Sequence, residues 1–170
     1  MKKCSVLFLL IVLIGSSQQK LFAQDYRFHS VFIYNFTKYI QWPEANNSGD
    51  FVIGVLGESP IIAELEKMAS TKTAGSQKFI IKKIESVAEV NKMQILFIPN
   101  ARSKFLEEVI GKVGTQPTLV ITEKPGLGQK GSGINFILVD GKWKFELNRA
   151  ATDKGGLKIS GELARLAIEI

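Results

Sequence analysis

The segment at residues 126–131, Gly-Leu-Gly-Gln-Lys-Gly, has the GxGxxG spacing that is found in dinucleotide-binding loops. In such loops the glycines lead from a strand into a helix, whose first amide groups bind the pyrophosphate. Here Pro125 precedes the segment, and residues 134–139 after it have the apolar pattern of a strand. We therefore interpret the segment as a glycine-rich loop and predict that it binds no nucleotide cofactor.

The sequence lacks the residues that a metal site or an acid–base catalytic site would require. His29 is the single histidine, and the single cysteine, Cys4, lies in the N-terminal leader. A metal site would have to surround one imidazole with carboxylates, and the acidic residues form no tight cluster. The glutamate pairs at 64/66 and 107/108 lie on predicted helices, where residues so close in sequence do not face each other. We predict a buried structural role for His29, no metal or other cofactor, and no enzymatic activity.

The N-terminus has the pattern of a secretory signal peptide. Lys2 and Lys3 precede an apolar run at residues 6–14, and Ala23 supplies a small residue before a cleavage point. The run is shorter than the roughly 20 residues that a membrane span requires. We predict a cleaved signal peptide at residues 1–23, a mature domain at residues 24–170, a periplasmic location and no membrane insertion after cleavage.

The mature chain is only weakly basic and has no cysteine. Loss of Lys2, Lys3 and Lys20 with the leader lowers the formal charge from +6 to +3. This scattered excess does not indicate a nucleic-acid-binding protein. Without disulfides, a secreted domain of this length must be stabilised by its hydrophobic core.

An aromatic helix is predicted over residues 28–42, and Pro43 ends it. At 100° per residue, one broad arc contains most of its apolar side chains, with Asn35 near the middle as a polar anchor. The arc consists of Phe28, Val31, Phe32, Phe36, Tyr39, Ile40 and Trp42. We expect Trp42 and Trp143 to lie in the core, although tryptophan is also enriched where partners bind.

The rest of the mature chain alternates between strand and helix patterns. Strands are predicted at residues 51–57, 78–84, 94–98 and 118–122, and helices at residues 59–69 and 102–113. Asp140-Gly141 then joins strands 134–139 and 142–147 as a β-hairpin. Ser160 caps a last helix that carries Leu163, Leu166 and Ala167 on its apolar side. The predicted fold is a single α/β domain with a mixed, mostly parallel sheet, flanking helices, and a C-terminal hairpin followed by a helix.

Three separated blocks of the chain resemble the YfiR family of periplasmic proteins. They lie at residues 34–43 with the strand 53–57, at residues 131–136 with 143–148, and at residues 156–167. The residues that carry the resemblance, which we expect to be mainly structural, are Tyr34, Asn35, Phe36, Lys38, Tyr39, Trp42, Pro43, Gly131, Phe136, Phe145, Asn148, Gly156, Leu157 and Ser160.

The resemblance implies a regulatory role. Members of the family sit in the periplasm and restrain an inner-membrane diguanylate cyclase of the YfiN type, which lowers cyclic di-GMP and biofilm formation. Some members carry cysteine pairs, which the mature chain lacks. The alternative function is a small-molecule-binding envelope module that signals to another membrane partner, such as a sensor kinase. The sequence leaves open whether the protein forms a homodimer.

A ligand or partner patch is predicted near the C-terminus. Its residues are Asn148, Arg149, Ser160 and Arg165, which flank the final turn and helix. The structural alternative for the same residues is local helix capping and hydrogen bonding at the end of the sheet.

Overall fold

The computed structural model describes residues 26–46 and 48–170. The predicted signal peptide at residues 1–23 lies outside the described residues. The first helix is described over residues 26–39. The later helices are α2 (Ile61–Ala69), α3 (Leu106–Val113), α4 (Arg149–Lys154) and α5 (Gly161–Leu166), and short 3₁₀ segments cover Glu44–Asn46, Val87–Glu89 and Asn100–Phe105. The strands are β1 (Ile40–Gln41), β2 (Phe51–Leu56), β3 (Thr73–Ala74), β4 (Gln77–Ile84), β5 (Ile95–Ile98), β6 (Leu119–Thr122), β7 (Ile134–Val139), β8 (Lys142–Leu147), β9 (Lys158–Ile159) and β10 (Ile168–Glu169).

Eight strands form one mixed sheet in the order β10-β8-β7-β6-β5-β2-β4-β3. The five adjacent strands β7, β6, β5, β2 and β4 are parallel to one another, and β10 runs parallel to β8. The antiparallel pairs are the hairpin β7–β8 and the short pair β3–β4. Asp140 and Gly141 both have positive φ, as the predicted two-residue hairpin turn requires. These pairings confirm the predicted mixed, mostly parallel α/β fold.

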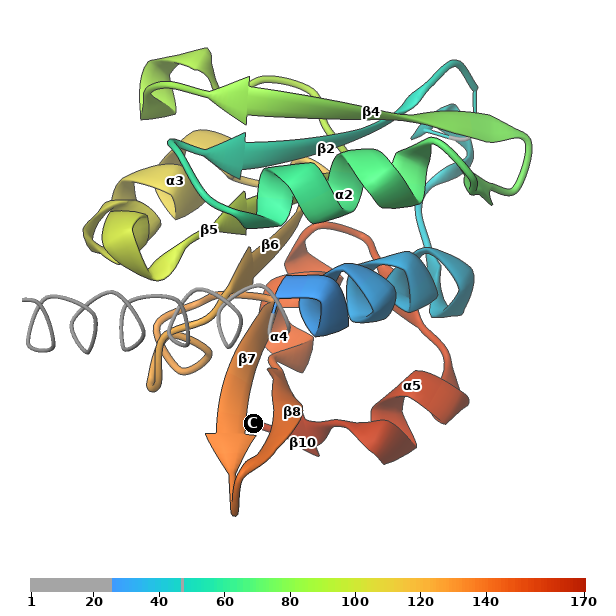
Figure 1. Cartoon of the computed structure of the whole chain (residues 1–170). Helices are drawn as coiled ribbons and strands as arrows, with labels where there is room; N and C mark the ends of the chain where they lie inside the picture. Colours follow the sequence, from blue (N-terminus) through green and yellow to red (C-terminus); the bar gives the residue numbers. More distant parts are fainter. Residues whose placement is uncertain (1–25, 47) are drawn as a thin grey trace, which may run out of the picture.

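Helices cover both faces of the parallel strands. The first helix and α2 pack on one face, where Ile33, Phe36 and Leu65 meet side chains such as Phe97. Helix α3 packs on the other face, where Val109 joins a second buried cluster. Figure 1 shows α2 over β2 and α3 on the far side of the sheet, with the β7–β8 hairpin projecting beyond the helices. Burial on both faces explains the nearly continuous apolar runs of β2, β5 and β6.

The predicted register of the first helix is wrong. Its buried stripe contains His29, Ile33 and Phe36, whereas Phe28 and Val31 of the predicted arc are exposed. Aromatic residues occur around much of this helix, so the sequence predicts a broad apolar arc. In the structure only a narrower stripe faces the sheet, where Phe36 packs against Phe136 and Phe145. Asn35 is half-buried and lines a groove shared with α2, so it is not the buried anchor that we predicted.

The end of the first helix also differs from the prediction. Helical structure stops at Tyr39, and Ile40–Gln41 form β1, which pairs antiparallel with β9. Ile40 lies opposite Ile159 in this small two-stranded sheet. A distant segment of the chain therefore ends the helix three residues earlier than Pro43 alone would require.

The C-terminal third contains three elements that the sequence patterns missed, α4, β9 and β10. Residues 149–154, interpreted as a polar connection, form α4, and the last residues extend into β10. Helix α5 follows Ser160 as predicted, but of its expected apolar side only Leu163 is buried, because Leu166 faces solvent. The predicted helix 102–113 is α-helical only from Leu106, after a 3₁₀ segment.

Candidate functional site

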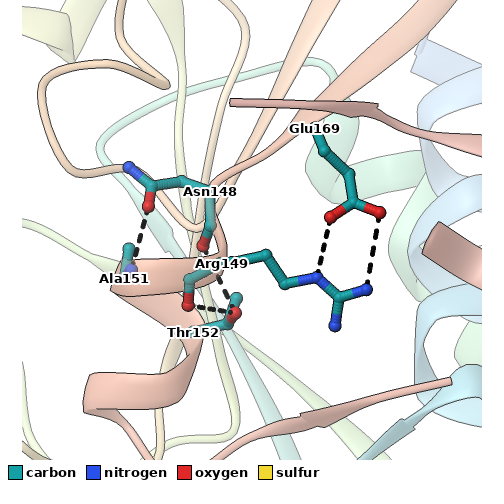
Figure 2. A network of polar contacts seen from close by, with 5 residues as sticks. All are labelled: Asn148, Arg149, Ala151, Thr152 and Glu169. Carbon is teal, nitrogen blue, oxygen red and sulfur yellow. Dashed lines mark hydrogen bonds and ion pairs between the residues drawn. The ribbon is translucent and has the colours of Figure 1, made fainter.

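The N-terminus of α4 is fixed by Asn148, which directly follows β8. The Asn148 side-chain oxygen accepts a hydrogen bond from the Ala151 amide at 2.9 Å, and its side-chain nitrogen donates to the Gly128 carbonyl at 2.9 Å. The buried Thr152 hydroxyl lies within hydrogen-bonding distance of the carbonyl oxygens of Asn148 and Arg149, at 3.2 and 3.0 Å. Figure 2 shows the contacts of Asn148 with Ala151 and of Thr152 with Asn148 and Arg149 at the start of the helix. Asn148 therefore acts as a helix cap and joins α4 to the glycine-rich loop.

Arg149 joins α4 to the last strand. Its Nε donates to Glu169 Oε2 at 3.0 Å, and a second nitrogen lies 3.5 Å from Oε1, as Figure 2 shows. The hydrogen bond from Arg149 lowers the pKa of Glu169, and the hydrogen bond from Glu169 raises the pKa of Arg149. Both side chains are partly exposed, so this ion pair positions β10 more than it stabilises the fold.

Ser160 caps α5 in the same way that Asn148 caps α4. The Ser160 hydroxyl oxygen accepts a hydrogen bond from the Leu163 amide at 3.2 Å. Hydrogen bonds from the backbone amide of Glu162 and from the Ser160 side chain lower the pKa of the Glu162 carboxyl. Arg165 projects from the exposed side of this helix. Both capping residues of the predicted patch thus have structural roles, Arg149 is paired with Glu169, and Arg165 is exposed to solvent.

Exposed apolar side chains adjoin these two arginines. Leu166 is 67% exposed, Ile168 is 38% exposed and Ile170 is 40% exposed. Ile168 belongs to β10, which is the last strand of the sheet and pairs with β8 along one edge. In the part of the chain that the structure describes, its other edge has no neighbouring strand. An edge strand with exposed apolar side chains can pair with a further chain.

A buried polar network lies next to this edge, on the side of the sheet away from the first helix. The Thr122 hydroxyl lies 2.9 Å from the Ser132 hydroxyl and donates to the Asn135 side-chain oxygen at 2.7 Å. Asn135 in turn donates to Glu146 Oε2 at 2.7 Å. Thr122, Ser132 and Asn135 are fully buried. The sequence patterns did not predict this network. The polar residues Thr122 and Asn135 within otherwise apolar strands could have indicated it.

The glycine-rich loop lies against this network at Glu146 and does not lead into a helix, as a dinucleotide-binding loop would. As predicted, a strand rather than a helix follows it. A Cβ atom at Gly128 would lie 2.7 Å from a carboxylate oxygen of Glu146 and 2.6 Å from a side-chain carbon of Ile170. The absence of a side chain at Gly128 therefore allows the loop to lie against β8 and the C-terminal residues.

Many of the residues that carry the family resemblance lie in the core. Phe36 packs against Phe136 and Phe145, with ring centroids 6.0 and 5.2 Å apart. The buried Trp42 donates from Nε1 to the carbonyl oxygen of Gln94 at 3.2 Å. Leu157 is also buried in this cluster. The predicted core location of Trp42 is confirmed, whereas Trp143 is half-buried at the margin of the core.

The other residues of that set lie on or near the surface. Lys38, Tyr39 and Pro43 are exposed, and the Lys38 ammonium lies 4.3 Å from the centroid of the half-buried Tyr34 ring. Gly131 and Gly156 occupy turns with positive φ, a conformation that favours glycine. A mixture of core, turn and surface positions therefore carries the resemblance.

His29 is buried, as predicted, with 1% of its surface exposed. Its ring stacks on Phe136 with centroids 4.1 Å apart, and Nδ1 lies 3.6 Å from Glu123 Oε2. The Tyr26 hydroxyl donates to the other oxygen of Glu123 at 3.0 Å. These contacts attach the first helix to the end of β6. Within residues 26–46 and 48–170, no group of three or more histidine, cysteine, aspartate or glutamate side chains is arranged to hold a metal ion.

Comparisons with known proteins identify the family. No helix in the described ranges, 26–46 and 48–170, is long and apolar enough to span a bilayer. No curated protein matches the chain. A family model described as YfiR/HmsC-like matches residues 26–168, which include both buried clusters, the α4 network and the start of β10. The chain belongs to the YfiR/HmsC-like family.

Proposed function

We propose that this protein is a non-enzymatic periplasmic regulator of cyclic di-GMP signalling, which binds and restrains a membrane-bound diguanylate cyclase sensor. The observation that carries the proposal is the family match over residues 26–168. The leader pattern at residues 1–23 supports export to the periplasm, followed by cleavage before the mature domain. The cyclase domain of the partner would lie across the inner membrane, so this protein would act on its periplasmic sensor region.

The partner surface in this proposal is the C-terminal edge of the sheet. We define this surface as Arg149, Arg165, Leu166, Ile168 and Ile170. Its apolar side chains are exposed, the Arg149–Glu169 ion pair holds β10 in place, and the exposed Arg165 adds positive charge. Apolar anchors surrounded by arginine are typical of protein-binding surfaces.

The proposed mechanism is stoichiometric. The protein would bind the inactive state of the sensor more tightly than the active state, and the difference in affinity would shift the sensor toward inactivity. No chemical step is required. Loss of the protein, or of its partner surface, would then leave the cyclase active and increase surface attachment.

Gene deletion combined with complementation tests this function. We expect the deletion strain to contain more cyclic di-GMP and to form more biofilm, and the wild-type gene to reverse both changes. Affinity purification of the tagged protein from solubilised membranes should recover a diguanylate cyclase. Unchanged cyclic di-GMP in a deletion of an expressed gene contradicts the proposal. Recovery of a sensor kinase in place of a cyclase would favour the alternative envelope module.

A further inference from the structure

A cavity of about 270 Å³ is lined by residues of α3 and α4. Ile110 and Val113 of α3 form one wall, and Leu119 at the start of β6 forms another. Ala151 of α4 and Leu157 complete the apolar lining. We propose that this cavity binds a small aromatic or branched aliphatic molecule, with any carboxylate of that molecule directed to Lys154.

Residues with little or no side chain keep this space open. Gly131, Gly133 and Gly155 all line it, together with Ala150 and Ala151. A Cβ atom at Gly131 would lie 2.8 Å from a side-chain carbon of Ile110, so any other residue would displace this part of the wall. At Gly133 a Cβ atom would lie 3.1 Å from Leu119 and 3.3 Å from Thr152. At both positions glycine therefore allows the wall side chains to pack close to the backbone, and a larger residue would displace them.

Three polar side chains of the lining, Asn148, Thr118 and Thr152, already have partners within the protein. Asn148 uses its oxygen on the Ala151 amide and its nitrogen on the Gly128 carbonyl. The Thr118 hydroxyl donates to the Met93 carbonyl at 2.7 Å. The Thr152 hydroxyl contacts carbonyl oxygens of its own helix. A ligand therefore does not need polar groups along most of its length, and burial of apolar surface would supply the affinity.

Lys154 would determine the orientation of a bound ligand. It lines the cavity from the last turn of α4 and is exposed to solvent, so its side chain can present the ammonium at the mouth of the cavity. An anionic group on the ligand could remain hydrated while it contacts this ammonium. The class of ligand that fits both features is an apolar body with a carboxylate at one end.

The volume sets the size of the ligand. An apolar cavity of about 150 Å³ is large enough to bind benzene. The larger space here can accept a substituted ring or a branched chain of similar bulk. A long acyl chain does not fit the same volume in an extended form.

Titration of the ¹⁵N-labelled protein with toluene and with phenylacetate tests this site. We expect saturable amide shifts at Gly131, Gly133 and Ala151 with both probes. Ala151→Leu should weaken the binding of both at least tenfold, because its side chain occupies the cavity. The matched control is Ala63→Leu on the exposed side of α2, which should bind both probes as the wild type does. Ala150→Leu replaces Ala151→Leu if circular dichroism shows that the latter is unfolded.

A second variant tests the direction of binding. Lys154→Gln should weaken phenylacetate several-fold and leave toluene unchanged. Two results would overturn the proposal: absence of saturable shifts at the cavity amides with either probe, or wild-type binding by a folded cavity-filling variant. Equal phenylacetate affinity in the Lys154→Gln variant would overturn the assigned orientation. Binding is measured on the isolated protein, so failure here leaves the proposed regulation of a cyclase unaffected.

Discussion

The Arg149 guanidinium and the Glu169 carboxylate form an ion pair, with Nε 3.0 Å from Oε2. This contact joins the first residue of α4 to the last strand of the sheet, 20 residues later in the chain. It therefore connects the helix beside the apolar cavity with the edge that we propose as the partner surface.

The first prediction concerns the titration of Glu169. Because the hydrogen bond from Arg149 lowers its pKa, Glu169 should titrate below the ordinary value of 4.5 in the folded protein. The ion pair then contributes to stability above the unfolded pKa, and its contribution disappears as the pH falls through the folded pKa. A carboxyl ¹³C NMR titration measures this shift. In Arg149→Gln the midpoint should return toward 4.5, and an unchanged midpoint would contradict the assigned cause.

The second prediction concerns the partner surface. Ile168→Lys should abolish partner recovery and fail to restore low cyclic di-GMP in the deletion strain, because a charge replaces an exposed apolar side chain in β10. Leu138→Lys is the matched control, since Leu138 is 58% exposed on β7 but lies outside the proposed surface. This control should complement fully. If both variants complement equally well at equal protein levels, the partner binds elsewhere.

The third prediction concerns the buried polar network. Asn135→Ala should lower the free energy of unfolding by about 1–3 kcal/mol, because the Thr122 hydroxyl and the Glu146 carboxylate each lose a hydrogen-bonding partner. Urea denaturation followed by circular dichroism measures the change. Asn91→Ala, at an exposed position, should change stability by less than about 0.5 kcal/mol. A similarly small effect at Asn135 would show that the network contributes little.

The fourth prediction concerns Trp42. Trp42→Phe should destabilise the protein by about 1–3 kcal/mol, because it removes the indole hydrogen bond to Gln94 and part of a buried side chain. Tyr39→Phe changes a nearby exposed aromatic residue and should have an effect below about 0.5 kcal/mol. Chemical denaturation of the two variants under the same conditions compares them directly. Equal stabilities would mean that Trp42 is not a core anchor.

The parts of the fold that depend on local chemistry could be predicted from the sequence. Asp140-Gly141 specifies a hairpin turn whatever surrounds it, and Ser160 specifies the start of α5. The apolar runs of β5 and β6 similarly reveal strands that are covered on both faces. In each case the signal and the structure it determines lie within a few residues.

The parts that depend on distant contacts could not be predicted. The first helix stops at Tyr39 because Ile40 pairs with Ile159, more than a hundred residues later. Strand β10 has only two residues, and its pairing with β8 defines it more than its own composition does. The sequence predicts the cap at Ser160, but helix α4, which Asn148 caps, and the contact between Arg149 and Glu169 are found only in the structure.

The residues that form the hydrophobic core and those of β10, which belong to the proposed partner surface, occupy separate parts of the chain. All members of both buried clusters precede residue 168, whereas Ile168, Glu169 and Ile170, which include two exposed isoleucines and the partner of Arg149, come after them. Deletion of residues 168–170 would therefore remove β10 from the proposed partner surface and leave both buried clusters intact. A variant shortened in this way should remain folded and lose only the contacts that we propose for the partner.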